Sequence, residues 1–560
     1  MNFTDTADMW WKNAVIYCAD VQTFVDNDGD GCGDLPGMTR RVDYLADLGI
    51  TCLWLMPFYP TANLDDGYDI TDFYGVDPRL GTSGDVVELL RTCESRGIKV
   101  IVDFVMNHSS DRHPWFVQAK RGPDDPKRHW YVWRRSAPPD TSKQVVFPDE
   151  EDSIWERDER SGEWFLHNFY KTQPDLNLAN PDVRDEIART MGYWLQLGVS
   201  GFRVDAVPFL FAEDQLPAKE RRFPAFDPHE YLHSLRSYTS RRVGHSALLG
   251  EVNLPYKEQK RFFGGRDGDE LTVQFDFNGM QAIYLAMARH DARPLAKALR
   301  ARPTTAATSQ WANFLRNHDE LTLDKLSDAE RQEVFDAFGP ETHMQMFGRG
   351  LRRRLPTMLG GDQRRIRMAY SLMFSLPGTP VLFYGEEIGM AENLDVPGRL
   401  AVRTAMQWDE SPHGGFTDGG RAPERRAPAG AWGPDRVNVA SQRGDPDSLW
   451  AFIQRLISRY RQSPEIGWSG VEILRQPAPS VLAHVCRHSE WAMVALHNFG
   501  DEPVEVEVEI PDLPDEAHLV DLLYDGDPIQ PGPGGRLGLT LDAYGHRWLR
   551  VTSPADRRLG

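Results

Sequence analysis

The stretches KVIVDFVMNH (residues 99–108) and VSGFRVDAV (199–207) decide the fold, because each is a short apolar run that ends in polar and charged residues. Six further runs follow this pattern: AVIYCADVQTF (14–24), TCLWLMPF (51–58), ALLGEV (247–252), LTVQFDF (271–277), WANFLRNHDE (311–320) and PVLFYGEEIG (380–389). Segments such as MTRRVDYLADLG and DVVELLRTCESRG lie between them, with one apolar stripe and a terminal Gly that are typical of helices. The alternation predicts an α/β protein with a closed parallel (β/α)8 barrel, or TIM barrel. A doubly wound open sheet is the alternative, which eight units over about 400 residues disfavour.

Two segments interrupt this alternation, and a third follows it. Residues 109–172 are rich in Trp, Pro, Asp and Arg, and are too long for a plain loop, which predicts an inserted subdomain. Residues from about 321 to 370 are charged and predicted to form a helical insert. From residue 468 the apolar pattern changes to period two, which predicts a C-terminal β-sandwich over 468–560. The barrel is then assigned to residues 1–108 and 173–467.

Composition bounds the class of protein. The chain has 560 residues, of which 41% are hydrophobic, enough for a large core, so a disordered chain is excluded. Its 63 basic and 83 acidic residues give a formal charge of −20. An acidic surface repels phosphate backbones and anionic lipids, so we expect no nucleic-acid partner and no membrane partner. Homo-oligomer formation is left open.

The cysteines and the N-terminus bear on the compartment. The five cysteines are odd in number and form no C-x-x-C pair, which predicts buried thiols and neither a disulfide framework nor a zinc site. The start, MNFTDTADMWWKN, is acidic where a signal peptide needs basic residues. No apolar run approaches the ~20 residues that span a bilayer. We therefore expect a soluble, cytoplasmic protein.

Several charged residues follow the apolar runs directly. They are Asp103, Asn107, His108, Arg203, Asp205, Glu251, His318, Asp319 and Glu320. The carboxyl ends of barrel strands share one rim, where active sites collect, and such groups are costly to bury for packing alone. No Gly-Lys dipeptide occurs, so a P-loop is excluded. Clustered carboxylates beside an Arg indicate acid/base and nucleophile chemistry at an acetal, for which retaining glycosidases place two carboxyls ~5–5.5 Å apart.

The motifs at this rim resemble those of a known family. DFVMNH (103–108), GFRVDAV (201–207), GEVN (250–253) and FLRNHDE (314–320) are similar, in order and spacing, to the four short regions of the α-amylase family of glycoside hydrolases and transglycosylases. QPDLN (173–177), SLPGTPVLFYGEEIGM (375–390) and VRTAMQW (402–408) add to the resemblance, which covers nearly the whole chain. It implies a retaining double displacement through a glucosyl-enzyme intermediate.

The resemblance implies roles for particular residues. Asp205 would be the nucleophile, Glu251 the general acid/base, and Asp319 the residue that stabilises the oxocarbenium-like transition state. Substrate contacts would come from Asp65, Tyr68, His108, Arg203, His318 and Arg403. Because Asp66 is adjacent to Asp65, the register there stays open, and Arg403 has a surface salt bridge as its alternative role.

Two further residues are interpreted by position. Arg203 lies two positions before Asp205, on the same face of the strand, and should keep that carboxylate ionised. Asp103 is expected to be a structural hydrogen-bonding residue beneath His108.

A second acidic cluster lies in the Gly-rich loop DNDGDGCGD (26–34). Asp26, Asp28, Asp30 and Asp34 repel one another unless a cation gathers them, and oxygen ligands suit Ca²⁺, with Mg²⁺ less well served. Gly37 stands where an EF-hand needs Glu, so an EF-hand is rejected. The family resemblance implies one structural calcium ion, with the backbone carbonyl of Cys32 as a further ligand; a solvated loop without a cation is the alternative. No organic cofactor is expected.

Other stretches bear on the substrate. QPDLN and the 26–34 loop are typical of family members that act on short α-glucosides. FLRNHDELTLDKLSDAER (314–331), GLRRRLPTML (350–359) and EIGM (387–390) resemble the members that isomerise maltose to trehalose by moving a caged glucose, with the 321–370 insert as a cap that excludes water.

Departures from that pattern affect the acceptor side. They are GEVNLP (250–255), RTAMQW (403–408), Leu400 and Ala401. A hydrolytic α-glucosidase, a transglucosylase or a phosphorylase with another acceptor therefore stays open. A catalytically inactive sugar-binding protein is the remote alternative.

Overall fold

The computed structural model describes residues 9–210, 213–475, 478–514 and 516–553, and its centre is a closed barrel of parallel strands in the order β1-β14-β10-β9-β8-β7-β3-β2. The strands are β1 (Ile16–Ala19), β2 (Cys52–Leu55), β3 (Lys99–Phe104), β7 (Gly201–Val204), β8 (Ala247–Gly250), β9 (Val273–Phe275), β10 (Gln310–Phe314) and β14 (Thr379–Phe383). Each lies within one of the eight predicted runs or begins one residue before it. Because β1 pairs with both β2 and β14, the sheet has no edge, and the predicted (β/α)8 barrel is confirmed over the open sheet.

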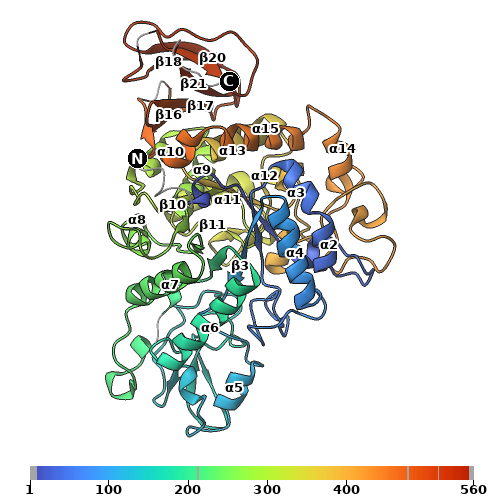
Figure 1. The fold of residues 1–560 in the computed structure, drawn as a ribbon, viewed down its shortest axis with the longest axis vertical. Coiled ribbons are helices and arrows are strands. Elements are labelled where there is room, and N and C mark those ends of the chain that lie inside the picture. The colour runs from blue at the N-terminus through green and yellow to red at the C-terminus, as the bar shows by residue number, and fades with distance from the viewer. Residues whose placement is uncertain (1–8, 211–212, 476–477, 515, 554–560) are drawn as a thin grey trace.

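Helices cover the barrel from outside (Figure 1). The longer ones are α3 (Val42–Leu48), α4 (Ser83–Ser95), α6 (Pro181–Leu197), α7 (Pro228–Arg242), α9 (Phe277–Arg289), α10 (Arg293–Ala301), α13 (Gln363–Ser375) and α15 (Leu449–Arg461). Local sequence sets their ends: α4 begins at a capping box formed by Thr82 and Asp85, and α6 has Asn180 as N-cap and ends at Gly198, whose φ is +119°. Strand residues are buried on both faces, which explains their continuous apolar pattern.

The segment after β3 forms its own small unit, at the end of the molecule opposite the C-terminal sheets (Figure 1). It contains α5 (Pro114–Ala119) and a three-stranded antiparallel sheet of β4 (Trp133–Arg134), β6 (Trp164–Leu166) and β5 (Trp155–Arg157). The Trp-rich stretch 130–135 packs within this unit, where the Arg128 guanidinium lies 3.2 Å from the centroid of Trp133. The predicted inserted subdomain has a structured core of its own.

The predicted helical insert at 321–370 is wrong in two respects. It holds one helix of more than two turns, α11 (Asp328–Phe338), beside a three-stranded sheet of β11 (Leu321–Thr322), β13 (Gly350–Leu351) and β12 (Gln345–Met346). Strands of two residues are too short for a periodic signal, so the sequence pattern did not reveal them. In addition, α13 begins at Gln363 and is the barrel helix before β14, so the insert ends near residue 362.

The C-terminal region consists of two antiparallel sheets. One contains β15 (Glu472–Ile473), β16 (Val481–His488), β17 (Trp491–Asn498), β21 (His546–Thr552) and β19 (His518–Asp521); the other pairs β18 (Val504–Glu509) with β20 (Arg536–Leu541). Apolar residues of both sheets share one core, as the sandwich prediction requires. The larger sheet also contacts the barrel, since Nε1 of Trp548 donates to Oγ of Ser371 on α13 at 3.0 Å.

The remaining expectations concern the whole chain. All five cysteines are buried and free. Within the described residues, no helix is both long and apolar enough to cross a bilayer. The outermost parts of the predicted first and last domains, residues 1–8 and 554–560, lie outside the described residues.

Candidate active site

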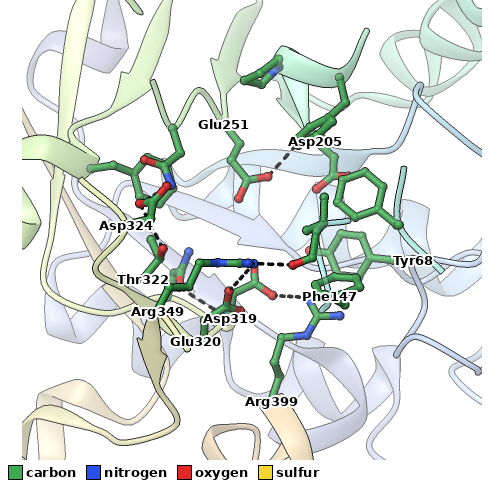
Figure 2. Close-up of a pocket in the computed structure, with 18 of the residues that line it drawn as sticks. Tyr68, Phe147, Asp205, Glu251, Asp319, Glu320, Thr322, Asp324, Arg349 and Arg399 are labelled. Carbon is green, nitrogen blue, oxygen red and sulfur yellow. Dashed lines mark hydrogen bonds and ion pairs between the residues drawn. The ribbon is translucent and has the colours of Figure 1, made fainter. Parts of the chain in front are cut away.

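A pocket of about 390 Å³ opens at the carboxyl ends of the barrel strands. Six predicted site residues line it: Asp65, Tyr68, His108, Asp205, Glu251 and Asp319. Figure 2 shows the carboxylates of Asp205, Glu251 and Asp319 pointing into the same space. Asp205 directly follows β7 and Glu251 directly follows β8. Because the parallel strands of a barrel end at a common rim, the barrel topology brings Asp205 and Glu251 together.

One guanidinium connects the two central carboxylates. Nη1 of Arg203 donates to Oδ1 of Asp205 at 2.6 Å and to Oδ1 of Asp103 at 2.6 Å, and Nη2 donates to Oε2 of Glu251 at 2.7 Å. Sharing one planar group limits the separation of Asp205 and Glu251 to several ångströms, which is compatible with the ~5–5.5 Å of retaining glycosidases. Asp103 is fully buried and also accepts from Nε1 of Trp54 at 3.0 Å, in keeping with its predicted structural role.

Asp205 and Glu251 have different pKa values, although burial raises both. Desolvation raises the pKa of Asp205 to about 6, although Arg203 opposes the rise. Desolvation raises the pKa of Glu251 to about 8, again against Arg203 and with a further upward contribution from Asp205. Arg203 thus acts on Asp205 in the expected direction, by lowering its pKa, but burial has the larger effect and the net shift is upward. At neutral pH one carboxyl is still mainly ionised and the other mainly protonated, as a nucleophile and a general acid require.

Asp319 has the opposite environment. Its Oδ1 accepts from Nη1 of Arg399 at 2.7 Å and from Nη2 of Arg403 at 3.0 Å, and its Oδ2 lies 3.1 Å from Nε2 of His318. Burial raises the pKa of Asp319, but His318, Arg399 and Arg403 together hold it well below its ordinary value. This carboxylate is permanently ionised and can stabilise positive charge that develops in the pocket.

Three predicted substrate contacts, Arg203, His318 and Arg403, do not line the pocket. His318 is fully buried, its ring is stacked on Tyr68 at 5.5 Å, and its Nε2 lies 2.8 Å from the Tyr68 hydroxyl. Arg403 is also buried and lies behind Asp319, where it bonds to that carboxylate and to Asp66. In this structure His318 and Arg403 support the pocket residues and do not themselves face the space.

His108 does line the pocket, as predicted. Its Nε2 is buried and has no hydrogen-bond partner among the described residues. Burial lowers the pKa of His108 to about 3, so the imidazole is neutral and can exchange a hydrogen bond with a hydroxyl group.

The register at the DDGYD motif follows from the backbone. Asp65 faces the pocket, where it accepts from Nε2 of Gln173 at 2.9 Å and from Nη2 of Arg399 at 2.5 Å. Asp66 adopts φ +51° and turns to the opposite side. Arg399, which local sequence pattern did not indicate, lines the pocket beside Asp319 (Figure 2). It forms ion pairs with both Asp65 and Asp319. Its only sequence signal is its place four residues before Arg403.

The other end of the pocket is polar and comes from the 321–362 insert and the GEVN motif. Oδ1 of Asp324 accepts from Nδ2 of Asn253 at 3.1 Å and from the Thr322 hydroxyl at 3.2 Å, and Oδ2 pairs with Nζ of Lys325 at 2.7 Å. Arg349 bonds to Glu320 at 3.2 Å and to the carbonyl of residue 146 at 2.7 Å, so the insert meets the subdomain beside the pocket. The sequence did not single out Thr322, Asp324, Lys325 or Arg349.

The acidic loop places three of its four aspartates together. Single carboxylate oxygens of Asp26, Asp28 and Asp34 lie within 4.8 Å of one another. Asp30 is exposed, and its Oδ1 accepts from the backbone N–H of Cys32 at 2.8 Å. Oxygen donors at this spacing fit a hard cation, and such a cation would offset the like-charge repulsion in the loop.

The segment HEYLH (229–233) on α7 also has the H-E-x-x-H spacing of a zinc-binding helix. Nδ1 of His229 lies 2.9 Å from Oε2 of Glu270, and Nδ1 of His233 lies 2.9 Å from Oδ2 of Asp269. Among the described residues, three potential metal ligands come together only in the 26–34 loop.

Comparisons with known proteins agree with this geometry. The family described as "Alpha amylase, catalytic domain" matches residues 16–338 and 341–468, and "Sucrose hydrolase-like, C-terminal domain" matches residues 492–550. The chain is 37% identical to the trehalose synthase of Thermus thermophilus over 547 residues, covering 96% of this chain and 55% of that protein. It is 35% identical to the trehalose synthase/amylase of Mycobacterium tuberculosis, covering 97% of this chain and 90% of that protein.

Solved structures show the same architecture. A trehalulose synthase variant is 26% identical with a TM-score of 0.76, over 97% of this chain and 100% of that chain. The α-amylase of H. orenii gives the same identity, TM-score and coverage. With a catalytic-domain match over most of its length and the three carboxylates at the barrel rim, this chain belongs to the α-amylase family of glycosidases and glucosyltransferases.

Proposed function

We propose that this protein isomerises maltose to trehalose by intramolecular glucosyl transfer, as a retaining enzyme. The observation that carries the proposal is the pair formed by an ionised Asp205 and a protonated Glu251, held on one guanidinium within a pocket bounded by two insertions. The names of the two trehalose synthase relatives support the choice of trehalose as product.

The first half of the proposed reaction cleaves maltose. The Asp205 carboxylate attacks the anomeric carbon of the non-reducing glucose, while the proton of Glu251 passes to the glycosidic oxygen. The C–O bond to the second glucose breaks, and a glucosyl ester of Asp205 forms. Positive charge on the ring in the transition state faces the ionised Asp319. Asp65, Tyr68, His108 and Arg399 bind the transferred sugar.

The second half reattaches the sugar through a different oxygen. The released glucose turns in the pocket and presents its anomeric hydroxyl to Glu251, now a carboxylate, which takes the proton as that oxygen attacks the anomeric carbon. The ester bond to Asp205 breaks and trehalose forms. We assign the polar end that contains Asn253, Asp324 and Lys325 to the acceptor glucose. The closure beside Arg349 favours glucose over water as acceptor.

The first experiment is proton NMR of the anomeric region during incubation with maltose. We expect the trehalose signal to grow while free glucose stays a minor product. Release of α-glucose without trehalose would instead identify a retaining hydrolase, in line with the departures at GEVNLP and RTAMQW. Turnover that depends on added inorganic phosphate would identify a phosphorylase.

We also propose that loop 26–34 holds one structural Ca²⁺ through Asp26, Asp28, Asp34, Asp30 and the carbonyl of Cys32. The three gathered carboxylates support it. Calcium at 100 times its Kd should add about 2.7 kcal/mol to the free energy of unfolding.

A thermal melt tests this proposal. We expect Ca²⁺ to raise Tm by several degrees over an EDTA-treated sample, and the Asp28→Asn variant to lose most of this increase. The Asp124→Asn variant, at an exposed position of the subdomain, should keep it. An equal response of wild type and Asp28→Asn would contradict the assignment.

A further inference from the structure

Seven charged side chains form a continuous chain of ion pairs that starts in the pocket and ends outside it. In order they are Asp65, Arg399, Asp319, Arg403, Asp66, Arg425 and Asp20. All seven are buried or nearly so, with side chains between 1% and 20% exposed. Four acids thus share three guanidinium groups, and every cation in the chain contacts two acids. Loss of one arginine would leave two guanidinium groups to neutralise four buried carboxylates. The effect of such a loss would therefore extend along the whole series of ion pairs.

Asp66 is the fifth member of this series of ion pairs, between Arg403 and Arg425, and lies at the outer corner of a tight turn. It adopts φ +51°, a left-handed backbone that residues other than Gly rarely take, and Gly67 follows at φ +93°. A Cβ on Gly67 would lie 3.0 Å from the carbonyl oxygen of Pro57, so the turn packs against the chain beneath it. The turn sends Asp65 and Tyr68 into the pocket and Asp66 away from it. The bonds to Asp66 therefore hold the turn that places Asp65 and Tyr68, two of the residues assigned to the transferred sugar.

Two arginines hold Asp66 from different parts of the chain. Nη1 of Arg403 donates to its Oδ2 at 2.5 Å, and Nη1 of Arg425 donates to the same oxygen at 2.9 Å, while Nη2 of Arg425 bonds to Oδ1. The rest of the Arg403 guanidinium is also occupied: Nε donates to the carbonyl of His318 at 2.8 Å and Nη2 to Asp319 at 3.0 Å. Arg403 is thus shared between Asp66 and Asp319, and Arg425 is the second cation bound to Asp66.

The segment that carries Arg425 is itself fixed. The backbone N–H of Arg421 donates to the carbonyl of Gly29 at 2.9 Å, and that of Glu424 donates to the carbonyl of Gly31 at 3.0 Å. The carbonyl of Arg425 accepts from the N–H of Ala405 at 2.8 Å. Arg425 is not among the residues that line the pocket, so it can affect the reaction only through its neighbours.

We propose that Arg425 is a positioning residue for glucosyl transfer, which neutralises Asp66 from the side away from the pocket and so leaves Arg403 free to orient Asp319. The proposal rests on the role proposed above for Asp319. Without Arg425, the unbalanced charge of Asp66 pulls Arg403 from Asp319 and loosens the turn that holds Asp65 and Tyr68. A small displacement of groups that touch the transition state is enough to slow a reaction by about 10- to 100-fold.

The test compares Arg425→Gln with wild type on maltose and on 4-nitrophenyl α-glucoside. We expect kcat to fall by about 10-fold or more with a smaller change in KM, because Asp319 acts on the transition state more than on bound substrate. Arg425→Lys should recover part of the loss, since it keeps the charge. The matched control is Arg436→Gln, an exposed arginine on the same connection, which should match wild type.

The double variant Arg425→Gln/Asp66→Asn separates positioning from stability. The neutral amide that replaces the Asp66 carboxylate no longer attracts the Arg403 guanidinium away from Asp319. We therefore expect kcat of the double variant to exceed that of Arg425→Gln alone. Wild-type kcat in Arg425→Gln, or a loss that tracks Tm and is not recovered by Asp66→Asn, would overturn the proposal. If the proposed function is wrong, the wild-type enzyme makes no trehalose from maltose. Hydrolysis of 4-nitrophenyl α-glucoside then still measures the effect of Arg425→Gln on kcat.

Discussion

Asp205→Asn should lower kcat on maltose by about 10⁴-fold or more while the protein stays folded. The amide has the size of the carboxylate but cannot form the glucosyl ester, so the first covalent step is lost. The fold should persist because the buried Arg203, which Asp205 partly neutralises, keeps Asp103 at 2.6 Å and Glu251 at 2.7 Å. Turnover measured by NMR and a circular-dichroism melt check the two halves of this expectation. Asp336→Asn, an exposed position on α11, is the matched control and should behave as wild type.

Smaller variants at this position test the nucleophile more directly. Asp205→Gly removes the side chain and leaves room for a small anion such as azide on the face of the sugar that Asp205 occupies. With 4-nitrophenyl α-glucoside, azide attack from that face gives β-glucosyl azide, because the inversion is not followed by a second one. Formation of the α-azide, or more than about a tenth of wild-type activity in Asp205→Asn, would contradict the assignment.

Much of this site was predictable because the barrel fixes where strand ends lie. Asp205 directly follows β7 and Glu251 directly follows β8, so once eight parallel strands are assigned, both must reach the same rim. The sequence also indicated Asp65 and Tyr68, but could not say whether Asp65 or Asp66 faces the sugar. That choice depends on the backbone of Asp66, which adopts a left-handed φ; Asp tolerates this conformation, but both candidates are Asp, so residue type does not separate them.

Other parts of the site depend on contacts between distant segments and could not be read from local pattern. Arg399 and Arg403 lie in and next to a short 3₁₀ helix, Gly398–Val402, where no periodicity indicates which arginine faces the pocket. Asp324 gains its partners from GEVN and from the insert, 71 residues apart in the case of Asn253. The small sheet of β11, β12 and β13 forms only because its two-residue strands meet beside the pocket, so composition suggested helix there.

Glu251→Gln should lower kcat/KM on maltose by about 10²- to 10⁴-fold, the usual contribution of a general acid. Glutamine keeps the shape of the side chain and cannot donate the proton that the glycosidic oxygen of maltose needs. A 4-nitrophenolate group departs as an anion without that proton, so its release in the first step should be far less affected. The second step needs Glu251 as a base, so the variant should release about one equivalent of nitrophenol and then stall as a glucosyl-enzyme. A rapid-quench burst and the mass of the intact protein measure this directly.

The pH profile follows from the same two carboxyls and shows which one acts as acid. Burial raises the pKa of Asp205 to about 6, and this group must be ionised to attack, so kcat/KM on maltose should fall as pH drops through 6. Burial raises the pKa of Glu251 to about 8, and this group must be protonated to donate, so kcat/KM should fall again as pH rises through 8. In Glu251→Gln with the aryl glucoside, the alkaline decline of the burst rate should disappear while the acid decline stays. Only the replaced group can cease to titrate. If Glu251→Gln instead lost the decline at acid pH, Glu251 would be the group that must be ionised, and the roles assigned to Asp205 and Glu251 would be exchanged.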